Sequence, residues 1–520
     1  MSLRSKISHT QNRDKETINL PQNKMSEGTT MSSAMNDLPC VTVSAPGKIL
    51  LAGGYLVLEA PNAGFVIAAD KRFYTSVNGS SNKKRKKDEE NDDEKVIHIR
   101  VKSPQFHSEW NYTFNKSNGR LLPSSDNKSS NPFVEKSLRV CLIYILKSSQ
   151  SATNNTTPSS LDIIIRADND FYSVLSHLPP GSKKTPAEVA ALPKYLPCPL
   201  DPDTGKIVVH KTGLGSSAAL TTSLVGALVH YFRRDSNEGE LSAIIHNLAQ
   251  ICHCHAQGKV GSGFDVSSAC HGTHVYRRFP KCLLPDLLQQ LDNFEKESEI
   301  DDSNKQHFVL GETIKASVEL VPWKEDMVTP LNLPDDLQLL LADVRGGSES
   351  PSMARTVLKW KALQKANDDV PHWSALSKLN PKIVESIRLL SAKGSDSVDY
   401  DSLSKLPASE WPSDKDSPLL SLRDTFLQIR KELRLMGEAA DVPIEPPPQQ
   451  ELCDATSKLP GVVTALVPGA GGYDAVACLY INRPEVVKSI GELWSSWKSP
   501  IVCPLAVGAG NGGLRLEKNE

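Results

Sequence analysis

The segment that most constrains this chain is a glycine-rich loop running directly into an apolar helix-like stretch, HKTGLGSSAALTTSLVGALVHYF, His210 to Phe232. Gly213 and Gly215 permit tight turns and close approach of a ligand to the backbone, and Ser216 and Ser217 suit a helix start. The N–H groups there have no partner within the helix and, with the positive end of the helix dipole, favour a phosphate. A plain serine-capped helix after a turn also fits. The loop is neither a Walker A loop nor a dinucleotide-binding fingerprint, because both spacings are absent.

Two further glycine-bearing segments favour the phosphate-binding alternative. SAPGKILLAGGYLVLE predicts a Pro-Gly turn between two strands with Lys48 on it, and PGAGGYDAVACL places a second glycine-rich turn at the start of the segment from Pro468 to Leu479. A single lysine after Pro-Gly is most often a solvated turn residue. Three such segments, in this order along one chain of 520 residues, are too many to be independent accidents.

Strand-like and helix-like segments mix along the chain without a regular strand–helix–strand alternation, which predicts an α+β fold. Residues 1–38 are polar and poor in aromatic residues, so we expect a disordered tail. Ordered sequence is expected to begin at Val41. Further strands are expected at 64–77, 96–102, 161–168, 461–481 and 501–507, and helices at 131–148, 212–232, 240–258, 351–443 and 483–497.

Several segments interrupt this pattern. Residues 79–95, GSSNKKRKKDEENDDEK, contain a basic run that could be a nuclear-localisation or nucleic-acid patch. The adjacent acidic residues neutralise it, so we expect a solvated insertion between two strands. Residues 173–205 and 394–417 are expected to be loops, and two strands are expected to flank Asp343.

Composition limits the classes of function. With 59 Lys and Arg against 61 Asp and Glu, the net charge of -2 excludes a globally basic nucleic-acid-binding protein. No run is apolar enough for a membrane span, and the N-terminus lacks the apolar core of a secretory signal. The ten cysteines show no framework spacing, so we expect reduced thiols and a cytoplasmic protein. The Cys252-His253-Cys254-His255 run has the wrong spacing for structural zinc and predicts helix packing.

Three short segments, SAPGK, GLGSSAA and PGAGG, together resemble the three motifs of the GHMP kinases, the superfamily of galactokinase, homoserine kinase, mevalonate kinase and phosphomevalonate kinase. LLAGGYLVLE and KTGLGSSAALTTSLVGAL look most similar to eukaryotic phosphomevalonate kinases. So do AQGKVGSGFDVSSACHGTHVYRRF, Ala256 to Phe279, and LADVRGGSESPSMARTVLKW, Leu341 to Trp360. The resemblance runs from about Val41 to the C-terminus, outside the charged insertion and the proline-rich loops.

The resemblance implies a two-domain α+β fold with ATP and the acceptor between the halves. The N-terminal, ribosomal-protein-S5-like domain would span 41–280, and the C-terminal, ferredoxin-like α/β domain 305–520. The implied reaction is ATP-dependent phosphorylation of 5-phosphomevalonate to 5-diphosphomevalonate in the mevalonate route to isoprenoids and sterols, with ATP and Mg²⁺ as cofactors. No nucleic-acid or membrane partner is expected, and the oligomeric state is left open.

The same motif matches imply roles for individual residues. Lys48 and Lys211 would offset the repulsion between two anionic reactants, and Asp265 stands where mevalonate kinase has its catalytic aspartate. Ser217 is the candidate metal ligand. The loop residues expected to hold the ATP phosphates are Gly213, Leu214, Gly215, Ser216, Ser217 and Ala218.

One difference discriminates within the superfamily. Mevalonate kinase carries Gln-Gly-Glu, whose carboxylate binds Mg²⁺, whereas this chain has Gln257-Gly258-Lys259. The loss of that acid argues against mevalonate kinase. Mevalonate kinase or another small-molecule GHMP kinase remains an alternative, and so does an inactive GHMP-fold binding protein.

Overall fold

The structure is a computed structural model. It describes residues 40–518 apart from 81–94, 150–157, 234–236, 297–302, 322, 324, 345–349, 365–369, 394–397, 415 and 474. The tail expected at 1–38 therefore lies outside the described residues, as does most of the charged insertion at 79–95.

The described residues form fourteen strands and thirteen α-helices. The strands are β1 (Val41–Ala52), β2 (Ala63–Ser80), β3 (Val96–Ser103), β4 (Ser108–Asn115), β5 (Leu121–Pro123), β6 (Ser160–Ala167), β7 (His274–Arg277), β8 (Val328–Pro330), β9 (Leu337–Val344), β10 (Val462–Leu466), β11 (Ala475–Ile481), β12 (Val502–Leu505), β13 (Ala509–Gly510) and β14 (Arg515–Glu517). The helices are α1 (Pro132–Ser149), α2 (Pro186–Ala190), α3 (Ser216–Phe232), α4 (Glu238–Gln257), α5 (Phe264–His271), α6 (Pro285–Lys296), α7 (Ser303–Glu319), α8 (Ser350–Leu363), α9 (Pro371–Lys393), α10 (Tyr400–Leu403), α11 (Pro418–Ala440), α12 (Pro447–Ser457) and α13 (Pro484–Ser496).

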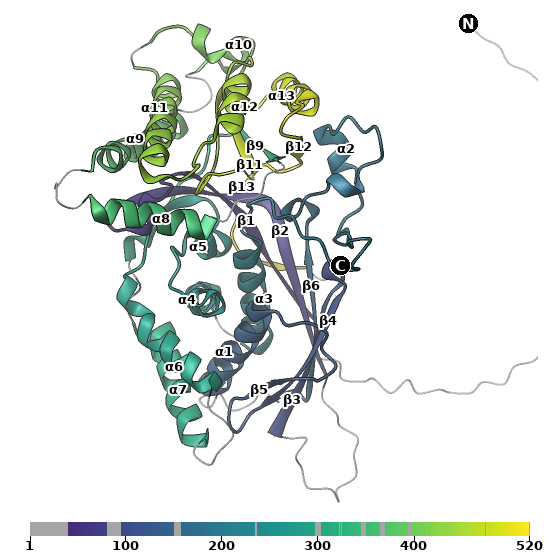
Figure 1. Cartoon of the computed structure of the whole chain (residues 1–520). Coiled ribbons are helices and arrows are strands. Elements are labelled where there is room, and N and C mark those ends of the chain that lie inside the picture. Colours follow the sequence, from purple (N-terminus) through teal and green to yellow (C-terminus); the bar gives the residue numbers. More distant parts are fainter. Residues whose placement is uncertain are drawn as a thin grey trace, which may run out of the picture. The chain divides into compact units, whose positions relative to one another are not determined.

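The larger sheet has ten strands, with the order β14-β1-β2-β6-β3-β4-β5; β7 and β13 also pair with β2, and β8 pairs with β7. All of these pairs are antiparallel except β3 with β6. Helices α3 and α5 lie against β1 and β2 on one face of this sheet, and α1 and α4 pack against α3 (Figure 1). Since α3 lies between the sheet and other helices, its side chains are buried almost all round, which is why its sequence is apolar on every face.

The first glycine-bearing segment folds differently from its prediction. The Pro-Gly turn expected at Lys48 is wrong, because β1 runs unbroken through it with an irregularity between Pro46 and Lys48. Proline has no N–H to give to a strand ladder, and a bulge is where a sheet tolerates it. The Lys48 N–H donates instead to the Leu214 carbonyl, at 2.9 Å. The bulge thus ties β1 to the loop before α3.

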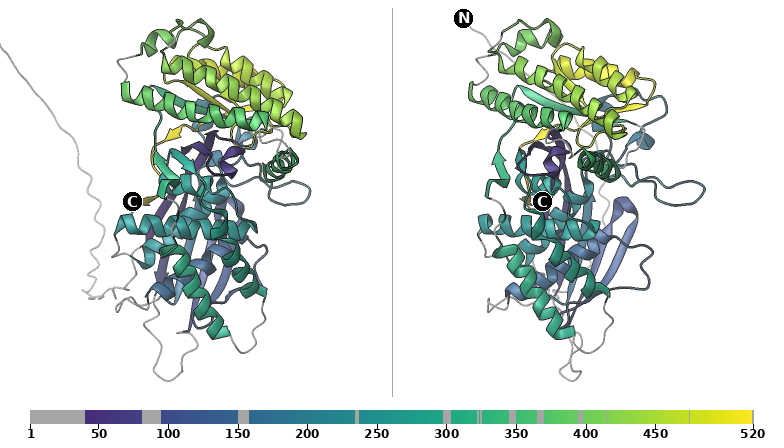
Figure 2. Two further views of the ribbon diagram at one scale, coloured as in Figure 1. Left: turned by 90° about the vertical axis from the view of Figure 1, so that its left-hand side faces the viewer. Right: turned by 60° about the vertical axis from the view of Figure 1, so that its left-hand side comes forward.

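The second sheet has four antiparallel strands in the order β10-β11-β9-β12. Strand β9 is buried on both faces. Leu339 and Leu341 join the core shared with the first sheet, whereas Leu340 and Ala342 pack on the other side with α12 and α13. The two strands expected to flank Asp343 are wrong, because Asp343 lies within β9 and is paired on both sides. Helices α11 and α12 pack against β10, α13 packs against β12, and α9 packs against α11 (Figures 1 and 2).

The end of the described chain returns to the first sheet, where β13 pairs with β2 and β14 pairs with β1. Buried Arg72 on β2 holds this return: its guanidinium donates to the Gly513 carbonyl at 2.6 Å and to Ser44 Oγ at 2.7 Å. Burial lowers the pKa of Arg72 to about 10. The first sheet is therefore built from both ends of the described chain.

Other expected elements fare unevenly. The strands beginning at Val41 and Val96 and the helices α1, α3, α4 and α13 are confirmed. The loop expected at 394–417 is partly wrong, because it contains α10 and buries Trp411.

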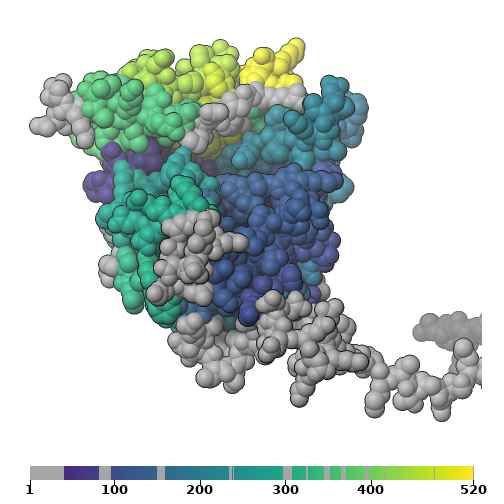
Figure 3. All heavy atoms as spheres, turned by 60° about the horizontal axis from the view of Figure 1, so that its bottom comes forward, coloured from purple at the N-terminus to yellow at the C-terminus, as the bar shows by residue number. Residues whose placement is uncertain are grey.

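Helices α6 and α7, which the sequence did not predict, pack against α4, and α7 also contacts α1. In Figure 3 their teal surface lies beside the blue surface of the preceding segments. Among the described residues, no helix has the length and apolar character needed to cross a membrane.

Candidate functional site

Lys48 and the glycine loop before α3 are in direct contact. The Lys48 ammonium donates a hydrogen bond to the Gly213 carbonyl at 2.7 Å. Its carbon chain passes so close to Gly215 that a Cβ there would lie 2.9 Å from Lys48 Cγ. Gly215 also has a φ of +76°, which other residues rarely adopt. Glycine is thus required twice at this position, and the contact joins the first two sequence segments.

The N-terminus of α3 is open toward the loop. Gly215 occupies the cap position, and no side chain there accepts a hydrogen bond from the first turn. Leu214 and Ala218 are buried, so they can offer a ligand only backbone groups. The Ser216, Ser217 and Ala218 N–H groups belong to the first turn, which has no intrahelical partners. The loop expected to hold phosphate therefore has the geometry of an anion site.

The third glycine-rich segment lies against the same place. The Gly469 N–H donates to the Leu50 carbonyl at 3.1 Å, and the Tyr55 hydroxyl donates to the Ala470 carbonyl at 2.5 Å. A small hollow of about 50 Å³ is lined by residues of all three segments, among them Lys48 and Gly213. The three segments that the sequence singled out therefore meet in space.

Asp265 lies in the first turn of α5, after Gly263 in the cap position. Its Oδ1 accepts the N–H of the next residue, Val266, at 3.0 Å. The Lys48 ammonium lies 5.7 Å from the ring centre of Phe264, the residue before Asp265. The predicted lysine and aspartate thus border the same region from β1 and α5.

His253 on α4 connects Asp265 with the helix start of α3. Its Nε2 lies 3.1 Å from Ser217 Oγ and 3.9 Å from Asp265 Oδ2. Burial is the largest influence on His253 and lowers its pKa, although Asp265 opposes this. The sequence assigned His253 only to helix packing. The signal that could have pointed to a role for His253 was Gln257, a polar residue four positions later and therefore on the same face of the helix. In the structure the Gln257 amide nitrogen lies 3.2 Å from His253 Nε2.

Lys211 lines a separate and larger cavity of about 740 Å³. It is exposed, and its backbone pairs with that of Tyr172 in an isolated bridge. The same cavity is bordered by Asp343, a buried carboxylate whose Oδ2 accepts the Ser173 hydroxyl at 2.5 Å. The structure thus places Lys211 just before the glycine loop at this cavity's wall, whereas Lys48, Ser217 and Asp265 lie around the loop itself. The sequence gave no reason to choose Tyr172 or Ser173.

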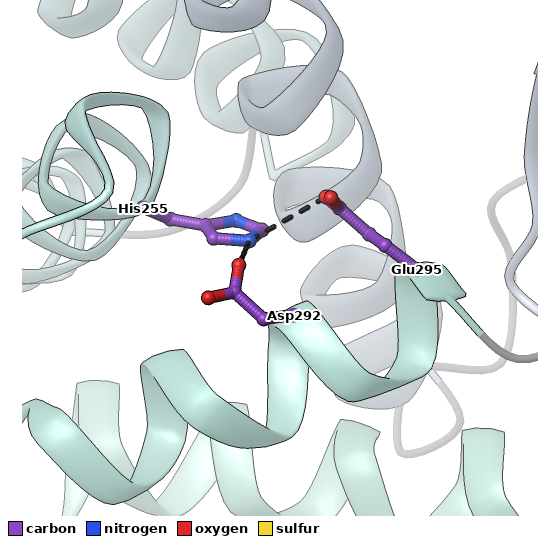
Figure 4. Close-up of side chains that lie close together, drawn as sticks. All are labelled: His255, Asp292 and Glu295. Carbon is purple, nitrogen blue, oxygen red and sulfur yellow. Dashed lines mark hydrogen bonds and ion pairs between the residues drawn. The ribbon is translucent and has the colours of Figure 1, made fainter.

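A second histidine of the same helix belongs to a different cluster. His255 Nε2 lies 3.1 Å from Asp292 and 3.4 Å from Glu295, as Figure 4 shows. These three side chain types could hold a metal ion. However, the Lys136 ammonium lies 3.8 Å from Asp292 and 3.6 Å from Glu295, and Arg139 also pairs with Glu295.

Two cations therefore already neutralise the two carboxylates of that cluster. Burial lowers the pKa of His255 to about 4, so the imidazole is neutral near pH 7 and its Nε2–H can serve the carboxylates. Cys252 and Cys254 are buried free thiols. The cluster is an ion-pair network that joins α4 to α6 and α1, in keeping with the helix packing predicted for this run.

The sequence and the fold of this chain were compared with those of known proteins. The family model described as the GHMP kinases N terminal domain matches residues 188–273, which include α3, α4 and α5. Among solved structures, the Lin0012 protein from Listeria innocua matches with a TM-score of 0.59 at 16% identity, over 92% of this chain and all of that one. The Streptococcus pneumoniae phosphomevalonate kinase in complex with phosphomevalonate and AMPPNP matches with a TM-score of 0.51 at 14% identity, over 86% and 95%. The expected α+β GHMP kinase fold is confirmed.

Sequence relatives narrow the family further. A phosphomevalonate kinase of Aspergillus fumigatus is 34% identical over 492 residues, which cover 89% of this chain and 91% of the relative. A phosphomevalonate kinase of Arabidopsis thaliana, named as peroxisomal, is 34% identical over 518 residues, covering 92% and 96%. Since these matches span nearly the whole length of both chains, the chain belongs to the phosphomevalonate kinase family of the GHMP kinases.

Proposed function

We propose that this chain transfers the γ-phosphoryl group of ATP to 5-phosphomevalonate, giving ADP and 5-diphosphomevalonate. The observation that carries the proposal is the meeting of Lys48, the open N-terminus of α3 and Asp265 around one loop. Full-length relatives named as phosphomevalonate kinases support the choice of acceptor. So does the Streptococcus pneumoniae enzyme of similar fold, which was solved in complex with phosphomevalonate and AMPPNP.

The chain's own groups suit the handling of two anions. Phosphoryl transfer depends mainly on positioning and on neutralising charge. The backbone of Gly213, Leu214 and Gly215 and the first-turn N–H groups of Ser216, Ser217 and Ala218 hold the ATP phosphates. Lys48, fixed by the Gly213 carbonyl at 2.7 Å, brings a positive charge to their edge. This preorganised charge offsets the repulsion between ATP and the acceptor phosphate.

Lys211 and the larger cavity suit the remainder of the nucleotide. The cavity of about 740 Å³ adjoins the chain just before the glycine loop, and its lining includes Val174, Leu175 and Leu196. Apolar side chains with a few polar groups are the usual lining of a small-molecule site. In this arrangement Lys211 reaches the phosphates from the nucleoside side.

Mg²⁺ fits the donor set at the helix start. Ser217 Oγ and Asp265 Oδ2 lie 3.1 and 3.9 Å from the same His253 nitrogen, so a hydroxyl and a carboxylate oxygen border one space. Oxygen donors of this kind, completed by phosphates and water, are what Mg²⁺ prefers. When bound, Mg²⁺ supplies charge neutralisation of the β- and γ-phosphates. We propose Ser217 as its protein ligand, with Asp265 close by.

Asp265 acts mainly by orientation rather than as a base. A phosphomonoester has its second pKa near 6, so near pH 7 the acceptor is already mostly a dianion and needs no proton removed. An alcohol acceptor would need a base. Asp265 therefore serves to orient Lys48 or the metal–phosphate group.

The test is a substrate panel. Purified protein is incubated with MgATP and mevalonate, 5-phosphomevalonate or galactose, and ADP and phosphorylated products are measured. Of the three acceptors, we expect only 5-phosphomevalonate to be turned over. Turnover with mevalonate or galactose instead would identify another GHMP kinase, and nucleotide binding without turnover would identify an inactive binding protein.

We also propose a cytoplasmic location. The described cysteines other than Cys40 are free thiols, which suits a reducing compartment. Fractionation of cells that express the full chain tests the proposal. Recovery with peroxisomes, the location in the name of the Arabidopsis relative, would contradict it.

A further inference from the structure

The side chain of His253 occupies a position that phosphate binding by the glycine loop does not by itself require. It is buried and comes from α4, between the start of α3 and the start of α5. Its Nε2 faces Ser217 Oγ at 3.1 Å, the Gln257 amide nitrogen at 3.2 Å and Asp265 Oδ2 at 3.9 Å. The ring of Phe133 on α1 packs against it, with the two ring centres 5.6 Å apart. The imidazole is thus fixed in place among four helices.

Hydrogen-bond accounting sets the state of this nitrogen. An amide nitrogen can only donate, so His253 Nε2 accepts from Gln257 and its hydrogen resides on Nδ1. The Ser217 oxygen lies 3.1 Å from the same nitrogen, which carries no hydrogen in this tautomer, so the Ser217 hydroxyl donates and shares the single lone pair with Gln257. The distance of 3.9 Å from Asp265 Oδ2 to His253 Nε2 is too long for a hydrogen bond, so the Asp265 carboxylate stays available for other partners.

The direction of the Ser217 hydrogen matters for a metal ligand. A hydroxyl that binds a cation must present a lone pair, and its hydrogen must point elsewhere. A partner that fixes a ligand's orientation in this way typically contributes about 10–100-fold to metal affinity or activity.

We propose that His253 is a positioning residue for phosphoryl transfer: by accepting the hydroxyl hydrogen of Ser217, it keeps the lone pairs of Ser217 Oγ turned toward the metal–nucleotide site. The proposal rests on the proposed function, which assigns Ser217 to Mg²⁺. It gives α4 a part in the site that the glycine loop, Lys48 and Asp265 do not supply.

A matched pair of substitutions tests the proposal. In His253→Gln the side chain can still bring an amide oxygen to the place of Nε2, whereas in His253→Asn the amide is one methylene shorter and cannot reach Ser217. The binding of AMPPNP, which is not turned over, is measured by calorimetry with and without Mg²⁺. Turnover and KM are measured with 5-phosphomevalonate.

In the wild type, Mg²⁺ should tighten AMPPNP binding. In His253→Gln, the factor by which Mg²⁺ tightens AMPPNP binding should stay within about threefold of wild type. In His253→Asn, this factor should be about 10–100-fold smaller, and kcat should fall by a similar amount. Metal-free AMPPNP binding and the KM for the acceptor should stay near wild type in both. In a Ser217→Ala background the Asn change should have no further effect, because residues acting as one unit are not additive. Equal Mg²⁺ dependence in the Gln and Asn variants would overturn the proposal.

A measurement on the unmodified chain covers the case in which a variant does not fold. Nitrogen NMR of histidine-labelled protein reports which ring nitrogen of His253 carries hydrogen. We expect a neutral ring protonated at Nδ1, both alone and with Mg²⁺ and AMPPNP. A hydrogen on Nε2 would refute the proposal. These binding and NMR readouts do not involve the acceptor, so a wild type that fails to phosphorylate 5-phosphomevalonate would contradict the proposed function separately.

Discussion

Two glycine turns meet at the site, and they use glycine for different reasons. Gly213, before α3, has a φ of +80°, yet a Cβ added there would meet nothing within 4 Å. Gly471, in the third segment, has a φ of +81°, and a Cβ added there would lie 2.1 Å from the Ile444 carbonyl oxygen. Gly213 is therefore surrounded by space, whereas Gly471 presses against the protein's own backbone.

This contrast separates an open turn, where we propose that phosphate binds, from a packed turn that supports the site. The Gly472 N–H donates to the Ile444 carbonyl at 2.8 Å, so the third segment is fixed on the chain that follows α11. That chain is anchored in turn by Glu445, a buried carboxylate paired with Arg430 and Arg434. Changes at the open turn should therefore alter catalysis, and changes at the packed turn should alter stability.

The largest effect is expected from Lys48→Met. The ammonium is fixed at the open turn by the Gly213 carbonyl, and preorganised charge of this kind is worth about 10²–10³ in rate. Turnover should fall by that factor with little change in Tm. Lys102→Met, which removes a lysine paired with Glu109 on β3–β4, is the control and should keep normal turnover. A Lys48 variant with normal turnover would place the lysine outside the catalytic machinery.

Next in size is Gly471→Ala, which tests the packed turn. The new methyl group would collide with a backbone oxygen that cannot swing away, and the left-handed backbone adds strain. Together these should cost about 2–5 kcal/mol of unfolding free energy. Gly469→Ala is the matched control, with a φ of +71° but nothing within 4 Å, and should cost only about 1 kcal/mol. Chemical denaturation measures both. If both variants lost the same unfolding free energy, the left-handed backbone conformation alone, and not the collision with Ile444, would determine the cost.

A smaller effect is expected from Gly213→Ala, the counterpart at the open turn. No atom of the protein obstructs the methyl group, so stability should fall by only about 1 kcal/mol. The methyl group would occupy the space proposed for phosphate, and KM for ATP should rise about tenfold while KM for the acceptor changes little. If Gly213→Ala instead caused a large loss of stability and left the KM for ATP unchanged, the turn before α3 would support stability rather than bind ATP.

The smallest effect concerns α5, which has one end in the site and the other in the interior. Its last residue, His271, packs between His246 and His274, with ring centres 4.9 and 6.3 Å away. Burial is the main cause that lowers the pKa values of His271 and His274 to about 4 and that of His246 to about 3. An unfolded histidine titrates near 6.5, so below that pH the unfolded chain takes up protons that the folded chain refuses.

Stability should therefore be fully present well above pH 6.5, begin to fall as the pH approaches 6.5, and continue to fall toward pH 4. Each such histidine contributes roughly 1 kcal/mol to the loss between pH 7.5 and 6. His271→Phe should make that decline shallower by about this amount, as measured by denaturation at several pH values. An unchanged slope would show that His271 is not held neutral in the folded state.

Much of the open turn could be predicted from sequence, because its signals are local. Two glycines, two serines and an apolar run predict the loop and α3 within a few residues. The bulge at Lys48 could not be predicted, since it depends on the Leu214 carbonyl, far along the chain. The role proposed for His253 depends on α3, α4 and α5 converging, and the sequence alone showed only a helix residue. The strands β13 and β14 are too short to give a periodic signal, and their partners are at the other end of the described chain.

That return of the chain has a consequence for biosynthesis. The contact between Ser44 on β1 and Glu517 on β14 spans 473 residues, so the strand that carries Lys48 leaves the ribosome long before its neighbour exists. The same late segment contacts the end of α5, where the Leu514 N–H donates to the Cys270 carbonyl at 3.0 Å. Pairings this distant in sequence form late and slowly. Both elements that carry the proposed catalytic lysine and aspartate are thus completed by residues synthesised hundreds of codons later, and a nascent chain halted before them would present β1 as an open edge to chaperones and proteases.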